Sequence, residues 1–135
     1  MILVDTSVWI DFFNGRKTAE TDTLDHFLGQ EPILIGDLIL TEILQGFRRD
    51  ADYRSAKVLL DTLELRILGG RQIALAAADN YRRLRRRGFT PRKTIDMIIG
   101  TYCLVHGLEL LHADRDFDLL EKEMGLMVAR AEPTV

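Results

Sequence analysis

The chain has 135 residues, 47% of them hydrophobic, so it is long enough to bury a core and is predicted to form a single domain over residues 1–135. Its net charge of -3 argues against a protein that coats nucleic acid through bulk charge, and its lone cysteine, Cys103, excludes a disulfide scaffold. Because it has neither a signal sequence nor an apolar run long enough to cross a membrane, we expect a soluble, cytoplasmic protein.

Short apolar runs alternate with amphipathic segments along the chain. Runs such as ILI at 33–35 are typical of buried strands, whereas the spacing of Trp9, Phe12 and Phe13 is typical of a helix. In chain order, the sequence predicts a strand at 1–5, helices at 8–15 and 20–30, a strand at 33–35, helices at 38–47 and 53–63, a strand at 65–68, helices at 71–88 and 93–107, a strand at 109–113, a helix at 116–124 and a short closing strand at 126–130.

Residue types that favour helix ends mark several of these boundaries. Thr6 or Ser7 is expected to cap the first helix, because a short polar side chain accepts a hydrogen bond from the free backbone N–H groups there. Asp37 and Thr94 are expected to cap the third and sixth helices in the same way. Gly107 is expected to end the sixth helix.

Strands that alternate with helices in this order indicate an α/β fold with a parallel sheet covered on both faces. The functional crevice of such a sheet lies beyond the carboxyl ends of its strands. Asp5 ends the first predicted strand, and Asp114 follows the strand ELLHA in the same manner. We therefore expect these two carboxylates to lie at one edge of the sheet, although more than a hundred residues separate them.

Two further acids fall in otherwise apolar helices. Asp96 lies in the first turn of its predicted helix, where the helix dipole favours a negative charge, and it shares a face with the packed residues Ile99 and Cys103. Glu42 is the only acid inside the predicted helix at 38–47. Taken singly, each acid has an ordinary structural explanation, such as a cap or a solvated helix face. Together, four clustered carboxylates should either take up protons or hold a cation.

An all-oxygen site of this kind suits a hard ion such as Mg²⁺ or Mn²⁺. Zinc is disfavoured, because the three histidines have neither a histidine partner at helical spacing nor a C-x-x-C motif. The sequence also lacks a phosphate-binding glycine loop and a G-x-S-x-G nucleophile motif. Any chemistry must therefore depend mainly on the acids.

The order MILVDTSVWIDFF, LTEILQG and TIDMIIGTYCLVHGLELLHADRDFDLL resembles the PIN-domain ribonucleases, specifically the VapC toxins of bacterial type II VapBC toxin-antitoxin systems. The resemblance covers nearly the whole chain. It implies a PIN-like three-layer α/β/α fold with a central, mostly parallel sheet of four to five strands. The catalytic acids it implies are Asp5, Glu42, Asp96 and Asp114. The supporting residues it implies are Thr6, Ser7 and Asp116.

The resemblance also implies a Mg²⁺- or Mn²⁺-dependent endoribonuclease toxin that a VapB-type antitoxin neutralises. Asp5, Asp96 and Asp114 are the expected metal ligands, and either Asp114 or Asp116 can be the fourth acid. A homodimer is expected, with operator DNA bound only through the antitoxin and no contact with a membrane. The early helices would form a groove for an antitoxin helix, which an exposed Trp9 would suit.

Basic residues are concentrated just before Asp96. Seven of the 18 lysines and arginines lie between Arg82 and Lys93, and one more follows Asp114. Such residues can receive an RNA backbone beside an acidic pocket, although the same stripe could instead form a solvated helix face or bind an acidic segment of an antitoxin. The candidate RNA-binding residues are Arg86, Arg87, Arg92, Lys93 and Arg115.

Two other functions compete with the nuclease. One is a PIN-like module that has lost catalysis and acts only by binding a partner, against which the full set of acids speaks. The other is a receiver-like domain phosphorylated on an aspartate at a strand end. Ser7 stands where a D-x-D pair would place a second acid, and this disfavours the receiver.

Overall fold

The computed structural model describes residues 1–130. Within this range, four strands form one parallel sheet in the order β3-β2-β1-β4, and seven helices accompany it. In chain order the elements are β1 (Ile2–Val4), α1 (Thr6–Phe13), α2 (Ala19–Phe27), β2 (Ile33–Gly36), α3 (Asp37–Gln45), α4 (Asp50–Leu60), β3 (Glu64–Arg66), α5 (Arg71–Arg86), α6 (Thr94–His106), β4 (Glu109–Leu111) and α7 (Asp116–Met124).

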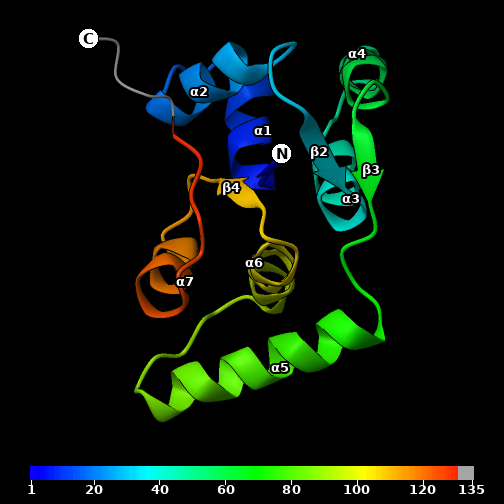
Figure 1. Cartoon of the computed structure of the whole chain (residues 1–135). Coiled ribbons are helices and arrows are strands. Elements are labelled where there is room, and N and C mark those ends of the chain that lie inside the picture. The colour runs from blue at the N-terminus through cyan, green and yellow to red at the C-terminus, as the bar shows by residue number, and fades with distance from the viewer. Residues whose placement is uncertain (131–135) are drawn as a thin grey trace, which may run out of the picture.

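The centre of the sheet is apolar on both faces. Leu3 of β1 lies opposite Leu34 of β2 on one side and Leu110 of β4 on the other, and all three side chains are buried. Strands buried in this way are typical of a parallel sheet with helices on both of its faces. In Figure 1, α5, α6 and α7 lie together on one side of the strands, whereas α1, α2, α3 and α4 lie on the other. The predicted three-layer α/β/α fold is confirmed.

A close contact between α6 and α7 brings the start of each helix to the sheet edge. Gly100 of α6 faces Leu120 and Phe117 of α7, and a methyl group in place of its hydrogen would overlap the Leu120 side chain. Glycine is thus required at this position for steric reasons. The two helices pack closely enough for Asp96 and Asp116, one in the first turn of each, to become neighbours.

The predicted helix caps were wrong in detail. Asp5, rather than Thr6 or Ser7, caps α1, because its carboxylate accepts the Ser7 backbone N–H at 3.1 Å. Thr94 is the first residue of α6 and not its cap, which is Lys93. Asp37 is likewise the first residue of α3, and its Oδ1 atom accepts backbone N–H groups from Leu38 and Leu68 instead.

The closing strand is shorter than predicted, and Trp9 lies in the core. The closing strand at 126–130 is reduced to one parallel bridge between Val128 and Leu110. Trp9 is fully buried, with its ring stacked near that of Phe13, so it belongs to the core and cannot be an exposed interface residue. In the portion of the chain that the structure describes, none of the helices combines the length and hydropathy that crossing a membrane requires.

Candidate active site

The carboxyl edge of the sheet gathers acids from four separate segments. Asp5 directly follows β1, and its backbone N–H donates to the Leu111 carbonyl at the end of the neighbouring β4 at 2.9 Å. Asp114 lies in the loop after β4, Asp96 in the first turn of α6, and Asp116 at the start of α7. The acids predicted at strand ends and at the α6 N-terminus therefore meet at one edge, as expected.

Three of these carboxylates form a tight group. Asp96, Asp114 and Asp116 each offer an oxygen atom, and the three oxygens lie within 4.8 Å of one another. Among the described residues, Asp96 Oδ2 and Asp116 Oδ2 are buried and have no hydrogen-bond partner. Both oxygens belong to acids of the group, and a divalent cation would satisfy them, because buried anionic oxygens without donors are otherwise costly.

Asp5 lies beside this group and is held by Ser7. The Ser7 hydroxyl donates to Asp5 Oδ2 at 2.6 Å, and Ser7 Oγ in turn accepts the Ala113 backbone N–H at 3.1 Å. One hydroxyl thus connects the first acid to the loop that carries Asp114. Burial raises the pKa of Asp5, and the charge of Glu42 raises it further, although the two hydrogen bonds from Ser7 oppose the change.

Glu42, on α3, lies near Asp5. Its Oε1 accepts a hydrogen bond from the Thr6 hydroxyl at 2.8 Å, which fixes the half-buried carboxylate close enough to influence Asp5 by charge. The sequence predicted Asp5 as the third metal ligand beside Asp96 and Asp114. The three oxygens that lie within 4.8 Å of one another instead include one from Asp116. Asp114 and Asp116 were alternatives in the sequence, whereas in the fold both belong to the group.

The two best-placed ligand candidates have opposite protonation tendencies. Burial is the main reason that the pKa of Asp96 rises to about 7, and the charges of Asp5 and Asp114 add to it. Burial also acts to raise the pKa of Asp114, but the N–H of Asp116 and the ammonium of Lys93 outweigh it and bring the pKa below its ordinary value. In the absence of a cation, the cluster thus takes up a proton at Asp96, one of the two outcomes expected of crowded carboxylates.

Only part of the basic stripe reaches the acids. Lys93 donates to Asp114 Oδ2 at 3.0 Å, and Arg92 lies 3.5 Å from Asp116 Oδ1. Arg115 is exposed and lines a hollow of about 370 Å³ together with Asp114. Arg87 pairs instead with Glu123, near the far end of α7. Arg86, at the end of α5, is exposed.

His112 is a site residue that the sequence analysis missed. Its Nδ1 accepts the backbone N–H of Asp114 at 3.3 Å, so the ring helps to fix the loop that carries this acid. The hydrogen must then reside on Nε2, which lies 4.0 Å from Asp118 Oδ1. A histidine directly after the apolar pair Leu110 and Leu111, two positions before an acid, was the available signal.

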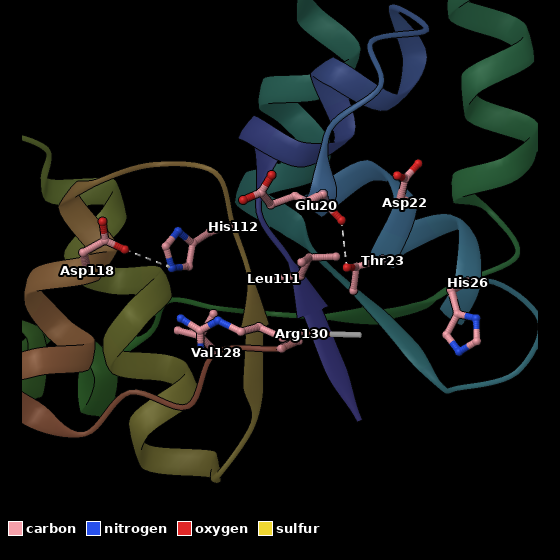
Figure 2. A pocket seen from close by; sticks show the side chains of 11 residues that line it. Glu20, Asp22, Thr23, His26, Leu111, His112, Asp118, Val128 and Arg130 are labelled. Carbon is pink, nitrogen blue, oxygen red and sulfur yellow. Dashed lines mark hydrogen bonds and ion pairs between the residues drawn. The ribbon is translucent and has the colours of Figure 1, made fainter. Parts of the chain in front are cut away.

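A larger hollow, of about 550 Å³, lies between α2 and the segments that carry His112 and Asp118 (Figure 2). His112 and Asp118 form one wall, and Figure 2 shows the imidazole of His112 pointing toward Asp118 on α7. Glu20, Thr23 and His26 of α2 line the opposite side. This hollow and the smaller one lined by Asp114 are neighbours, since Glu20, His112 and Asp118 line both.

Comparison with known proteins agrees with this arrangement of fold and acids. The sequence model of the PIN domain matches residues 2–123, so the chain belongs to the PIN domain family. Ribonuclease VapC11 of Mycobacterium tuberculosis and VapC ribonuclease Mb1587 of Mycobacterium bovis are each 30% identical to it over 131 residues, covering 96% of this chain and 98% of the relative. Within the PIN family, the chain therefore belongs with the VapC ribonucleases.

Solved structures support the same fold. A chain of the VapBC2 complex from Rickettsia felis, bound to a promoter DNA fragment, superposes with a TM-score of 0.75 at 14% identity, covering 98% of this chain and 100% of that one. VapC20 of M. tuberculosis, described as a sarcin-ricin loop cleaving toxin, gives a TM-score of 0.67 at 19% identity, with coverage of 97% and 100%. At these identities the likeness shows the fold alone.

Proposed function

We propose that this protein is a metal-dependent endoribonuclease toxin that acts in the cytoplasm and is neutralised by a VapB-type antitoxin. The observation that carries the proposal is the group formed by Asp96, Asp114 and Asp116, with its two orphaned buried oxygens. Its position at the carboxyl edge of the sheet is where ligands bind in parallel α/β folds. The ribonuclease names of the 30% identical relatives support RNA as the substrate class.

Each acid has a separate task in this proposal. Asp96, Asp114 and Asp116 would hold Mg²⁺ or Mn²⁺, the hard ions that carboxylates favour. When bound, such an ion lowers the pKa of a coordinated water and stabilises charge on the scissile phosphate. Asp5 retains a raised pKa next to the group, which suits it to accept the proton of the attacking water. Glu42 orients the site through Thr6.

The products follow from the bond that breaks. Attack of water on phosphorus with cleavage of the bond to the 3′ oxygen leaves a 5′-phosphate and a 3′-hydroxyl. The water gives one proton to Asp5, and the departing 3′ oxygen takes one from solvent. Mapping the cut ends would therefore test the direction of attack independently of rate.

The RNA backbone would cross the acids at the end of α6. Arg92, Lys93 and Arg115 surround the carboxylates there and can offset the repulsion between acids and phosphates. Arg86 and Arg87 lie further along the same basic stripe and would contact more distant phosphates. Contacts of this kind give affinity with little sequence information, so they do not identify the RNA.

The antitoxin would bind the groove between α1, α3 and α4, where aromatic side chains lie beside charged ones. Ile10 is exposed beside Phe13, and Phe13 packs edge-on to Phe47 at a centroid distance of 5.7 Å. Two hollows meet around Phe13 and Phe47, the larger of about 450 Å³. An amphipathic helix is the partner that such a groove accommodates. The protein would act as a homodimer and reach operator DNA only through its antitoxin.

Cleavage of total cellular RNA by the purified protein, with and without Mn²⁺, tests the proposal. We expect cleavage that requires the ion and that is lost in Asp114→Asn, while circular dichroism shows an unchanged fold. Asp61→Asn is the matched control, because Asp61 is an exposed acid at the end of α4. A protein that binds its antitoxin but leaves RNA intact with either ion would instead be the inactive binding module.

A further inference from the structure

Lys93 interacts with the acids differently from every other basic residue near them. Its ammonium lies 3.0 Å from Asp114 Oδ2, whereas the Arg92 guanidinium reaches Asp116 only at 3.5 Å. A lysine ammonium on the protein surface is charged throughout the physiological range. The cluster therefore already contains a cation supplied by the chain itself.

The hydrogen bonds of Asp114 show what this cation competes with. Asp114 Oδ1 accepts the backbone N–H of Asp116 at 3.0 Å, and Oδ2 accepts Lys93. Of the three grouped acids, Asp114 is thus the one that makes hydrogen bonds through both oxygens. A divalent ion that uses Asp114 must share Oδ2 with the ammonium or displace it, and two cations on one oxygen repel each other.

Lys93 is also placed to move. It is the cap residue of α6, in the loop that leads from the basic stripe of α5, and 55% of its side chain is exposed. A long, exposed lysine side chain can change rotamer without disturbing the core. Water reaches the Lys93 end of the salt bridge and screens its attraction to Asp114, which eases the exchange of one cation for another.

We propose that Lys93 is an internal counter-cation, which neutralises Asp114 while the site is free of metal, gives way to the incoming divalent ion, and then binds the RNA phosphate. The last step rests on the proposed ribonuclease function, whereas the first two do not. In this scheme Lys93 opposes metal binding and favours RNA binding. Loading the metal releases the side chain that positions the substrate, so the two events are linked.

The test is the affinity for Mn²⁺, measured by calorimetry on protein stripped with a chelator. Lys93→Met should bind Mn²⁺ three- to tenfold more tightly than the wild type, because the competing charge is gone. Lys57→Met is the matched control: Lys57 forms an exposed ion pair with Asp61 at 2.7 Å on α4, in the opposite helical layer. It should change the affinity less than twofold. Lys93→Arg, which keeps the charge, should restore most of the wild-type affinity.

A second readout separates this role from a purely structural one. At saturating Mn²⁺, Lys93→Met should cleave RNA at least tenfold more slowly and should bind a non-cleavable RNA more weakly, although it binds the metal more tightly. Unchanged or weaker Mn²⁺ binding by Lys93→Met would overturn the proposal. If wild-type protein cleaves no RNA while the affinities change as expected, the ribonuclease function fails and the counter-cation stands.

Discussion

Asp96→Asn should stabilise the metal-free protein at the same time as it removes a metal ligand. The folded protein holds the Asp96 proton up to about pH 7, whereas the unfolded chain releases it near its ordinary pKa of 3.8. Between these values the folded state binds more protons, so stability falls as the pH rises from about 4 to 7 and is level above. Asparagine cannot ionise, so the Asp96→Asn variant does not lose stability in this way as the pH rises.

The size of the effect follows from the same pKa. The rise of the Asp96 pKa from 3.8 to about 7 corresponds to about 4 kcal/mol of unfolding free energy over the full pH range. About 2–3 kcal/mol of this falls between pH 5 and pH 8. The gain in unfolding free energy for Asp96→Asn over the wild type should therefore grow by about 2 kcal/mol from pH 5 to pH 8, allowing for some relaxation around the charge. Burial of Asp96 is the main cause, so the estimate applies to a side chain that water barely reaches.

Urea denaturation in a chelating buffer at both pH values measures this difference. Asp25→Asn, on the exposed face of α2, is the control and should change stability by less than about 0.5 kcal/mol at either pH. Adding Mn²⁺ should then stabilise the wild type but not Asp96→Asn. Lower stability of Asp96→Asn than of the wild type at pH 8 without metal would refute this reasoning. A difference in unfolding free energy between the two proteins that does not change with pH would also refute it.

Three further substitutions test other parts of the site. Ser7→Ala removes the hydroxyl shared by Asp5 and the Ala113 N–H, so it should cost about 1–2 kcal/mol in urea denaturation and slow RNA cleavage, whereas Ser7→Thr should retain most of both. Gly100→Ala forces a methyl group against the buried Leu120 and should lower stability by about 1–3 kcal/mol; an unaltered melting temperature would mean that α7 can shift freely. Phe47→Ala should weaken binding of the antitoxin, measured by calorimetry, about tenfold or more without changing the rate of RNA cleavage, and equal affinity would place the antitoxin elsewhere.

The sequence predicted the fold well because its two periodicities are strong. Apolar runs of three to five residues are too short for helices and are typical of buried strands, and their alternation with helices indicated a parallel sheet. Asp5 and Asp114 could then be placed at one edge from topology alone. No knowledge of side-chain conformation was needed for that step.

The finer arrangement of the site depended on contacts that periodicity does not encode. Asp116 joins Asp96 because Gly100 allows α7 to approach α6, and a sequence pattern does not reveal how closely two helices pack. The ion pair between Lys93 and Asp114 joins residues 21 positions apart through a long side chain. The spacing of Trp9 fits either the core or an interface, and only the packing of the fold shows that it is buried.

The hydroxyl of Ser7 accepts a hydrogen bond from the backbone N–H of Ala113, which lies 106 positions further along the chain. During synthesis, the amino-terminal acid emerges early but has no partners until the loop after β4 follows it. A nascent or prematurely terminated chain that stops short of residue 114 thus holds only part of the acidic group. The acidic group, and the proposed activity with it, would therefore be assembled only after the loop that follows β4 has been synthesised.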